Sequence, residues 1–218
     1  MLTDEIIFIL SGAVSYLIGS IPTGYLLVRW RKGIDIRTFG SGSTGATNVA
    51  RALGKWAFLP VFAMDFAKGF LCIFFLPLIV PYWGYSLDPV PLLALQMGCG
   101  VLAIGGHLFP IFLRFRGGKG VATGAGVIVA LNVWVALAAL GFWFVVVLLF
   151  RYVSLASIAA VLSLPVAHLL LSETTSDAGR LLTGFYLFIA VVVVLMHRAN
   201  IARIVKGSES RISWRKKS

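Results

Sequence analysis

The chain alternates long apolar runs with short polar segments. Most of the runs reach the ~20 residues that an α-helix needs to cross the hydrocarbon core of a bilayer. The pattern therefore predicts an all-α integral membrane protein. The six runs span Glu5 to Val28, Ala57 to Val80, Pro91 to Leu113, Val121 to Phe150, Tyr152 to Leu171 and Leu181 to Met196.

The composition agrees with this class. Of the 218 residues, 59% are hydrophobic and 12% are charged, far from the averages of soluble domains. Acids near the N-terminus stand where a secretory signal would carry basic residues, so we expect the first run to be a membrane helix. Cys72 and Cys99 lie inside apolar runs without ligand-type neighbours, so we expect neither a disulfide nor a metal site, and no cofactor.

The distribution of basic residues predicts the orientation in the membrane. They gather from Arg29 to Lys55, from Arg114 to Lys119, and from Arg198 to Lys217, whereas connections 81–90 and 172–179 contain no Lys or Arg. Because cytoplasmic loops carry the excess of Lys and Arg, we place the basic segments in the cytoplasm and these two connections outside. This topology explains the net charge of +11 without a nucleic-acid partner.

The run from Val121 to Phe150 must then begin and end in the cytoplasm. A single helix there would place the basic C-terminal residues outside, so we expect two helices that divide near Asn132. Thirty residues give about 45 Å of helix, less than the ~60 Å of two full crossings, so the pair is expected to be short or partly re-entrant. The prediction is one polytopic domain over residues 1–218, with seven membrane helices, an external N-terminus and a basic cytoplasmic tail from about residue 207 to 218.

The first polar segment, Gly40 to Gly54, has the composition of a phosphate-binding loop, since glycines allow close backbone approach and small polar side chains supply hydrogen bonds. A helix that begins near Thr44 or Ala46 would point its amides at an anion and bring Arg51 to the same side. The alternative is a flexible connection between helices. The spacing matches neither a Walker loop nor a dinucleotide fingerprint. The candidate ligands are Gly40, Ser41, Gly42, Gly45, Thr47, Asn48 and Arg51.

The second polar segment, Gly105 to Thr123, combines cations with glycines beside a membrane face. Lys119 can bring a point charge to a phosphoryl group while neighbouring glycine amides complete a cradle. For Arg114 and Arg116, ligand binding and a role in setting topology are equal alternatives. The candidate ligands of this segment are His107, Gly117, Gly118, Lys119 and Gly120.

The third polar segment, 197–209, follows helical spacing. His197 and Asn200 share one helical face, with Arg203 nearby, and are expected to orient a polar head group. The alternative for His197 is an interface histidine without a catalytic role. Glu209 is expected to anchor a basic residue or to bind hydroxyl groups.

Two charged residues lie within the second apolar run, where burial of a charge is costly. Asp65 and Lys68 are three residues apart on one helical face and can pair with each other. We interpret them as a structural pair at the floor of the site. Direct contact of Lys68 with the ligand is the alternative.

Several catalytic patterns are missing or misplaced. The aspartates are scattered over both predicted faces, which disfavours metal-dependent lipid phosphotransfer. The sequence has no GxSxG elbow, and no acid follows His107 at the HxxxxD spacing. His168 and Glu173 have that spacing, but they lie on the predicted outer face, so we interpret it as coincidence.

The polar segments together resemble the signature segments of a known family. GSGSTGATNVARALG, GHLFPIFLRFRGGKGVAT and HRANIARIVKGSE are similar to those of the bacterial acyl-phosphate-dependent glycerol-3-phosphate acyltransferases, the PlsY family. YLIGSIPTGYLL and MDFAKG in the first two apolar runs resemble the family too, so the similarity covers most of the chain in order. One departure is Ser43, where the family usually has Asn, and both residues form hydrogen bonds.

The resemblance implies a seven-helix bundle in the bacterial inner membrane, with its active site at the cytoplasmic face. It also implies an acyl phosphate donor, sn-glycerol 3-phosphate as acceptor, lysophosphatidic acid as product, and no direct use of acyl-CoA or acyl carrier protein. Either His197 or a substrate phosphate would take the proton, and covalent catalysis by Ser41 is an alternative. A transporter or binding protein for phosphorylated metabolites, or a lipid-binding scaffold, are the non-enzyme alternatives. Phosphates would be held by Ser41, Thr47, Arg51 and Lys119, and the acceptor by His197 and Asn200.

Overall fold

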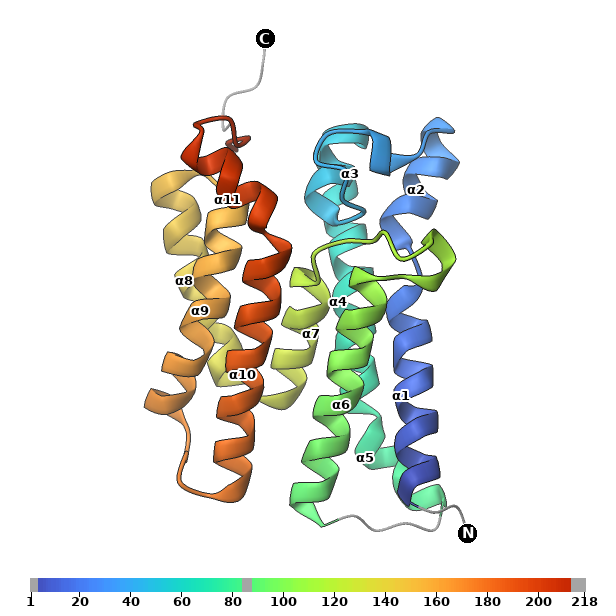
Figure 1. Cartoon of the computed structure of the whole chain (residues 1–218), viewed down its shortest axis with the longest axis vertical. Coiled ribbons are helices and arrows are strands. Elements are labelled where there is room, and N and C mark those ends of the chain that lie inside the picture. The colour runs from blue at the N-terminus through green and yellow to red at the C-terminus, as the bar shows by residue number, and fades with distance from the viewer. Residues whose placement is uncertain (1–3, 84–87, 213–218) are drawn as a thin grey trace. The chain divides into compact units, whose positions relative to one another are not determined.

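The computed structural model of the chain describes residues 4–83 and 88–212. Within these residues every regular element is a helix, as Figure 1 shows. The all-α membrane class is confirmed, whereas the count of seven crossings and the orientation of the termini remain predictions. An apolar helix of 11 residues, Val121–Leu131, is too short to be counted among the candidate spans. The six candidate spans are Glu5–Lys32, Lys55–Phe74, Pro89–Leu113, Val133–Phe150, Val153–Leu171 and Asp177–Met196.

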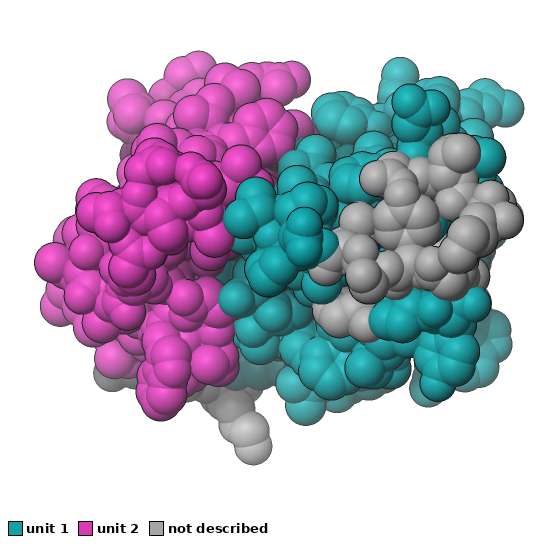
Figure 2. All heavy atoms as spheres, turned by 90° about the horizontal axis from the view of Figure 1, so that it is seen from below, with its two compact units in different colours: residues 1–131 teal, residues 132–218 magenta. Residues whose placement is uncertain are grey.

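The chain divides into two compact units, residues 1–131 and 132–218, which Figure 2 shows in different colours. That the whole chain acts as one domain remains a prediction. Unit 1 contains α1 Asp4–Ser20, α2 Thr23–Lys32, α3 Ala46–Leu53, α4 Phe58–Phe74, α5 Leu76–Ile79, α6 Pro89–Leu108 and α7 Val121–Leu131, with the 3-10 helices η1 Ile36–Thr38, η2 Lys55–Ala57, η3 Val80–Trp83 and η4 Ile111–Leu113. Unit 2 contains α8 Val133–Phe150, α9 Val153–Leu171, α10 Asp177–Met196 and α11 Arg198–Val205.

The first apolar run, predicted as a membrane span, is among the candidate spans but is broken into α1 and α2, a break that the prediction did not include. Pro22 explains the break, because proline has no backbone N–H and disfavours helical geometry in the residue before it. The carbonyl of Ile21 accepts a hydrogen bond from Nζ of Lys68 at 2.5 Å. The interruption thus supplies a backbone acceptor to a buried charge.

Glycines bring two pairs of helices in unit 1 into backbone contact. A Cβ on Gly19 of α1 would lie 2.1 Å from a backbone oxygen of α6, and one on Gly106 of α6 would lie 2.2 Å from a backbone oxygen of α1. Likewise, a Cβ on Gly69 of α4 would lie 2.0 Å from a backbone oxygen of α7, and one on Gly126 of α7 would lie 2.1 Å from a backbone oxygen of α4. Small residues allow such close packing of membrane helices. These contacts hold α6 and α7, the two helices between which the second polar segment lies, against α1 and α4.

The run from Val121 to Phe150 divides at Asn132, as predicted. Asn132 has extended backbone angles, φ −158° and ψ 102°, and its side chain accepts hydrogen bonds from the amides of Trp134 and Val135, both at 3.1 Å. An asparagine in this position is a strong helix N-cap. It therefore ends one helix and begins the next.

In unit 2, the connection from α9 to α10 is held by its own polar side chains. Glu173 accepts hydrogen bonds from the amides of Thr175 and Ser176, at 2.6 and 3.0 Å. His168 instead lies 3.1 Å from the carbonyl oxygen of Gly179. The two residues therefore have separate partners, which supports interpreting their HxxxxD-type spacing as coincidence.

The first part of the C-terminal tail folds back onto the α8–α9 connection. The amide of Ile212 donates to the carbonyl of Arg151 at 2.8 Å, and Nε of Arg211 donates to the hydroxyl of Tyr152 at 2.8 Å. The remainder of the predicted basic tail, 213–218, lies outside the described residues.

Candidate active site

The first polar segment forms a tight loop that leads into α3. Gly40 and Gly42 have positive φ angles of 58° and 71°, which glycine adopts without strain. The helix begins at Ala46 with Gly45 as its N-cap residue, as predicted. Ser41, next to Gly40, is half-buried in this loop.

Asn48 holds this loop together from the first turn of α3. Its side chain is 2% exposed. Nδ2 donates to the carbonyls of Phe39 and Ser43, both at 2.9 Å, while Oδ1 accepts from the amide of Ser41 at 3.0 Å. Both N–H groups of Asn48 are therefore used inside the loop.

Arg51 lies on the exposed side of α3, one turn beyond Thr47. A Cβ on Gly40 would lie 3.9 Å from Cδ of Arg51, so the side chain passes over the start of the loop. The loop thus brings Gly40 close to Arg51, and the binding of phosphate by Ser41, Thr47 and Arg51 stays a prediction.

The second polar segment turns back onto the end of α6. The amide of Gly117 donates to the carbonyl of Leu108 at 3.1 Å, and that of Gly118 donates to the carbonyl of His107 at 3.0 Å. Both amides are used within the protein, so the predicted cradle of glycine amides is wrong at these two positions. Lys119 follows, half-buried, directly after this pair.

Steric contact also explains why glycine occupies position 118. A Cβ there would lie 2.0 Å from Nε2 of His107. His107 is 7% exposed, and its Nδ1 lies 3.7 Å from Oδ1 of Asp65. The imidazole thus lies between the acid of α4 and the loop that carries Lys119. Gly120, with φ 77°, then leads into α7.

The predicted pair of Asp65 and Lys68 is confirmed. Nζ of Lys68 lies 2.6 Å from Oδ1 of Asp65, and it also contacts the Ile21 carbonyl at 2.5 Å and Oγ1 of Thr23 at 3.3 Å. Thr23 donates in turn to Asp65 at 2.5 Å. A lysine ammonium has three N–H donors, so these contacts use all of them.

This cluster lines a pocket in unit 1 that joins the first two polar segments. Thr44 comes from the first segment, while His107 and Pro110 come from the second. Asp65 and Lys68 form part of the wall between them. The pair therefore lines this pocket, with its charges turned toward each other, and its place at the floor of an active site stays a prediction.

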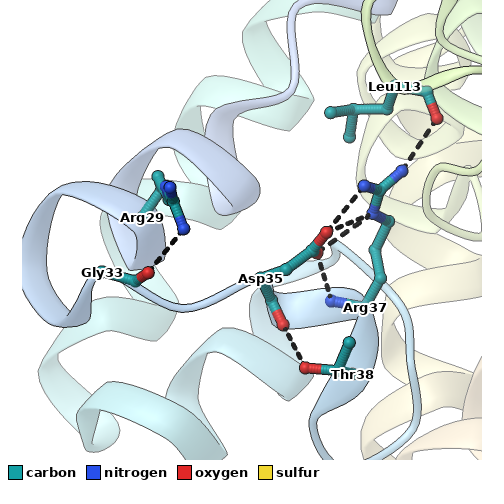
Figure 3. A network of polar contacts seen from close by, with 6 residues as sticks. All are labelled: Arg29, Gly33, Asp35, Arg37, Thr38 and Leu113. Carbon is teal, nitrogen blue, oxygen red and sulfur yellow. Dashed lines mark hydrogen bonds and ion pairs between the residues drawn. The ribbon is translucent and has the colours of Figure 1, made fainter.

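An ion pair gives the two segments a second connection (Figure 3). Arg37 contacts both carboxylate oxygens of Asp35, with Nη2 at 2.6 Å, and donates from Nη1 to the carbonyl of Leu113 at 2.9 Å. Hydrogen bonding to Arg37 lowers the pKa of Asp35. Asp35 therefore fixes the arginine that ties the chain before Gly40 to the second segment.

The third polar segment belongs to unit 2, where His197 marks the bend between α10 and α11. Its side chain is 2% exposed, and Nδ1 lies 2.8 Å from the carbonyl oxygen of Val193. Because a carbonyl only accepts, Nδ1 carries the proton in the neutral ring. The nitrogen with basic character is then Nε2.

Glu209 organises this segment. Its Oε1 accepts from Asn200 at 2.7 Å and from Ser154 of α9 at 2.8 Å, while Oε2 accepts from Nε of Arg203 at 2.7 Å. Burial raises the pKa of Glu209, but these three hydrogen bonds outweigh it and leave the pKa below the usual value. Of the two predicted roles for Glu209, anchoring a basic residue is observed.

The sequence prediction missed Thr23 and Ser154. Thr23 could have been found from Pro22, because a proline inside an apolar run predicts that one helix ends there and that the next begins at the following residue. Ser154 has no local signal, because its partner Glu209 lies 55 residues away.

The chain is similar to known proteins over most of its length. The family profile described as Glycerol-3-phosphate acyltransferase matches residues 9–207. Proteins of that name from Prochlorococcus marinus (strain MIT 9301) and Synechococcus sp. (strain CC9902) are 42% and 44% identical, covering 91% and 94% of this chain and 94% and 96% of their own.

Solved structures extend the similarity to the fold. The crystal structure of PlsY (YgiH), an integral membrane glycerol 3-phosphate acyltransferase, in its glycerol 3-phosphate form matches with a TM-score of 0.80 and 36% identity, covering 94% of this chain and 96% of that one. Its lysophosphatidic acid form matches with a TM-score of 0.77 at the same 36% identity, covering 94% of this chain and 95% of that one. The chain therefore belongs to the PlsY family of integral membrane glycerol-3-phosphate acyltransferases.

Proposed function

We propose that this membrane enzyme transfers the acyl group of an acyl phosphate to the 1-hydroxyl of sn-glycerol 3-phosphate. The products are 1-acyl-glycerol 3-phosphate, which is lysophosphatidic acid, and orthophosphate. The related PlsY structures are described as glycerol 3-phosphate and lysophosphatidic acid forms, which correspond to this acceptor and this product. The observation that carries the proposal is the buried, oriented His197 next to the segment that Glu209 orders.

The chemistry requires little from a protein nucleophile. An acyl phosphate is a mixed anhydride, so its carbonyl carbon is already activated and orthophosphate is its leaving group. The acceptor oxygen forms a bond to the carbonyl carbon, the bond from that carbon to the phosphate oxygen breaks, and the hydroxyl proton leaves with a base. Catalysis then rests on positioning the two substrates and stabilising the charge on the oxygens.

Two phosphorylated substrates explain the use of cations and small polar groups. We assign Arg51 and Lys119, with Ser41 and Thr47, to the phosphates, because charge-assisted hydrogen bonds bind phosphoryl oxygens strongly. Asn200 and Arg203, held by Glu209, are assigned to the acceptor.

The remaining candidates support these groups. Asn48 orders the first loop, and His107 with Gly117 and Gly118 sets the path of the second. Lys68 neutralises Asp65 beneath them. Gly42, Gly45 and Gly120 allow the turns at which the loops enter their helices.

We assign the proton of the acceptor hydroxyl to Nε2 of His197, with a phosphate oxygen of the acceptor as the alternative base. A His197→Ala variant separates the two. Loss of turnover at saturating glycerol 3-phosphate, with an altered pH profile, supports the histidine. Near-normal turnover with a raised KM assigns the proton to the phosphate and leaves His197 the role of holding the acceptor.

The proposal extends to the location of the enzyme. From the three basic segments, 29–55, 114–119 and 198–217, we infer that the active site lies at the cytoplasmic face of the bacterial inner membrane. The donor is acyl phosphate rather than acyl-CoA or acyl carrier protein.

The experiment measures release of orthophosphate and formation of lysophosphatidic acid by the purified protein in micelles, with palmitoyl phosphate or palmitoyl-CoA as donor and with or without glycerol 3-phosphate. We expect release only from palmitoyl phosphate together with the acceptor. A Lys119→Ala variant is expected to lose most of the activity, whereas Lys206→Ala, which removes an exposed lysine at the end of α11, retains it. Acylation from palmitoyl-CoA alone, or equal activity of the two variants, would contradict the proposal.

A further inference from the structure

The guanidinium group of Arg31 contacts two indole rings, those of Trp30 and Trp56, in unit 1, and we call these three side chains the clamp. Cζ of Arg31 lies 4.6 Å from the centre of the Trp30 ring and 5.3 Å from that of Trp56. Trp30 belongs to the last turn of α2 and Trp56 to η2, so two elements distant in sequence build the arrangement. Trp30 is 75% exposed and Trp56 is 52% exposed, so neither ring belongs to the core.

The clamp rests on a packed base. Directly beneath it, Val28 of α2 and Ala57 of η2 are fully buried in one apolar cluster, which also includes residues of η1, α3 and α4. Val28 is two positions before Trp30 in the sequence, and Ala57 directly follows Trp56. The relative positions of the two rings are therefore set by core packing.

The clamp also lies at the ends of two candidate membrane spans. Trp30 and Arg31 are in the last turn of the candidate span Glu5–Lys32, and Trp56 is in the first turn of the candidate span Lys55–Phe74. Whichever face of the membrane these ends reach, they lie at the boundary between hydrocarbon and water. Tryptophan is enriched at this boundary because it combines an apolar ring with a polar N–H.

The charge around the clamp has one sign. Arg29, Lys32 and Lys55 flank Arg31, and residues 29–34 and 51–64 contain no acid. The nearest acid along the chain, Asp35, is paired with Arg37. Within residues 4–83 and 88–212 the Arg31 guanidinium makes ring contacts but no hydrogen bond. Stacking uses the faces of the guanidinium and leaves its in-plane N–H donors directed outward.

We propose that Trp30, Arg31, Lys32, Lys55 and Trp56 form a binding site for the head group of an anionic bilayer phospholipid. The Arg31 guanidinium would bind the phosphate through its in-plane donors, and the two indoles would hold it at head-group depth. The lysines add attraction for the anionic surface. None of these residues belongs to the machinery assigned to acyl transfer, so the site would bind a lipid that is not a substrate.

Native mass spectrometry of the full chain, after equilibration with equal amounts of phosphatidylglycerol and phosphatidylcholine, tests this site. We expect the wild type to retain phosphatidylglycerol preferentially. Arg31→Gln should lower the ratio of the two bound lipids by about fivefold, as expected for one basic residue at an anionic surface. Arg180→Gln removes the same charge from an exposed arginine that pairs with Asp177 in the α9–α10 region and should not change the ratio.

Two further variants separate the clamp from charge alone. Arg31→Lys keeps the charge but lacks the planar stacking group, and Trp56→Leu removes one ring, so both should fall between the wild type and Arg31→Gln. Acyltransferase turnover in detergent checks that each variant is folded. The proposal is overturned if the wild type shows no preference for phosphatidylglycerol, or if Arg31→Gln and Arg180→Gln give the same ratio.

Discussion

The carboxylate of Glu209 binds Ser154, Asn200 and Arg203, so one acid orders the segment that follows His197. Its pKa lies below the usual value of 4.5 in the folded protein. The charged form therefore contributes stability at pH values above 4.5, and this contribution is lost as the pH falls through the lower, folded value.

At the scale of this residue, Glu209→Gln should lower the free energy of unfolding at pH 7 by about 1.5–3 kcal/mol, the usual effect of losing hydrogen bonds to a charged group. The difference from the wild type should shrink as the pH falls below about 4.5, because the unfolded wild type then binds a proton at Glu209, and it should vanish once the folded carboxyl is protonated at its lower pKa. Thermal unfolding in detergent between pH 3 and pH 8 measures this. Glu5→Gln, which changes an exposed acid, is the matched control. A constant difference at every pH would show that the charge of Glu209 is not what stabilises the segment.

At the scale of elements, the second loop can pack against the end of α6 only because residue 118 has no side chain. Gly118→Ala would place a Cβ 2.0 Å from Nε2 of His107 and should destabilise the protein by about 1–3 kcal/mol. Because the loop carries Lys119, acyltransferase activity should fall by about tenfold or more. A Cβ on Gly105 of α6 meets no atom within 4 Å, so Gly105→Ala should keep full activity. Equal activity of the two variants would refute the packing role of Gly118.

The elements also show what the sequence can predict. The break at Asn132 was predictable, because a single helix there would place the basic C-terminal residues on the outer side of the membrane. The break at Pro22 was missed, since the first run is long enough for one helix despite its proline. Asn48 was interpreted as a ligand because a loop-ordering asparagine and a ligand-binding one look alike in sequence. Its contacts depend on how the backbone from Phe39 to Ser43 folds around it.

At the scale of the whole molecule, the seven-crossing topology remains a prediction that α7 and α8 together enter and leave the same membrane face. Single cysteines at Ile34 and Ser208, with Cys72 and Cys99 replaced by Ala, test it in spheroplasts with an impermeant maleimide. We expect both cysteines to react only after permeabilisation, and one at Asp177, whose side chain is 78% exposed, to react at once. If Ile34→Cys and Ser208→Cys react from opposite sides, the chain crosses six times.

The central claim is that one reaction joins an acyl phosphate to glycerol 3-phosphate by attack at the carbonyl carbon. The most direct measurement uses palmitoyl phosphate and glycerol 3-phosphate labelled with ¹⁸O in the 1-hydroxyl, with mass spectrometry of both products. We predict one orthophosphate for each lysophosphatidic acid, with the label in the ester of the lipid and none in the orthophosphate. Label in the orthophosphate, or orthophosphate released without acylated product, would contradict this reaction.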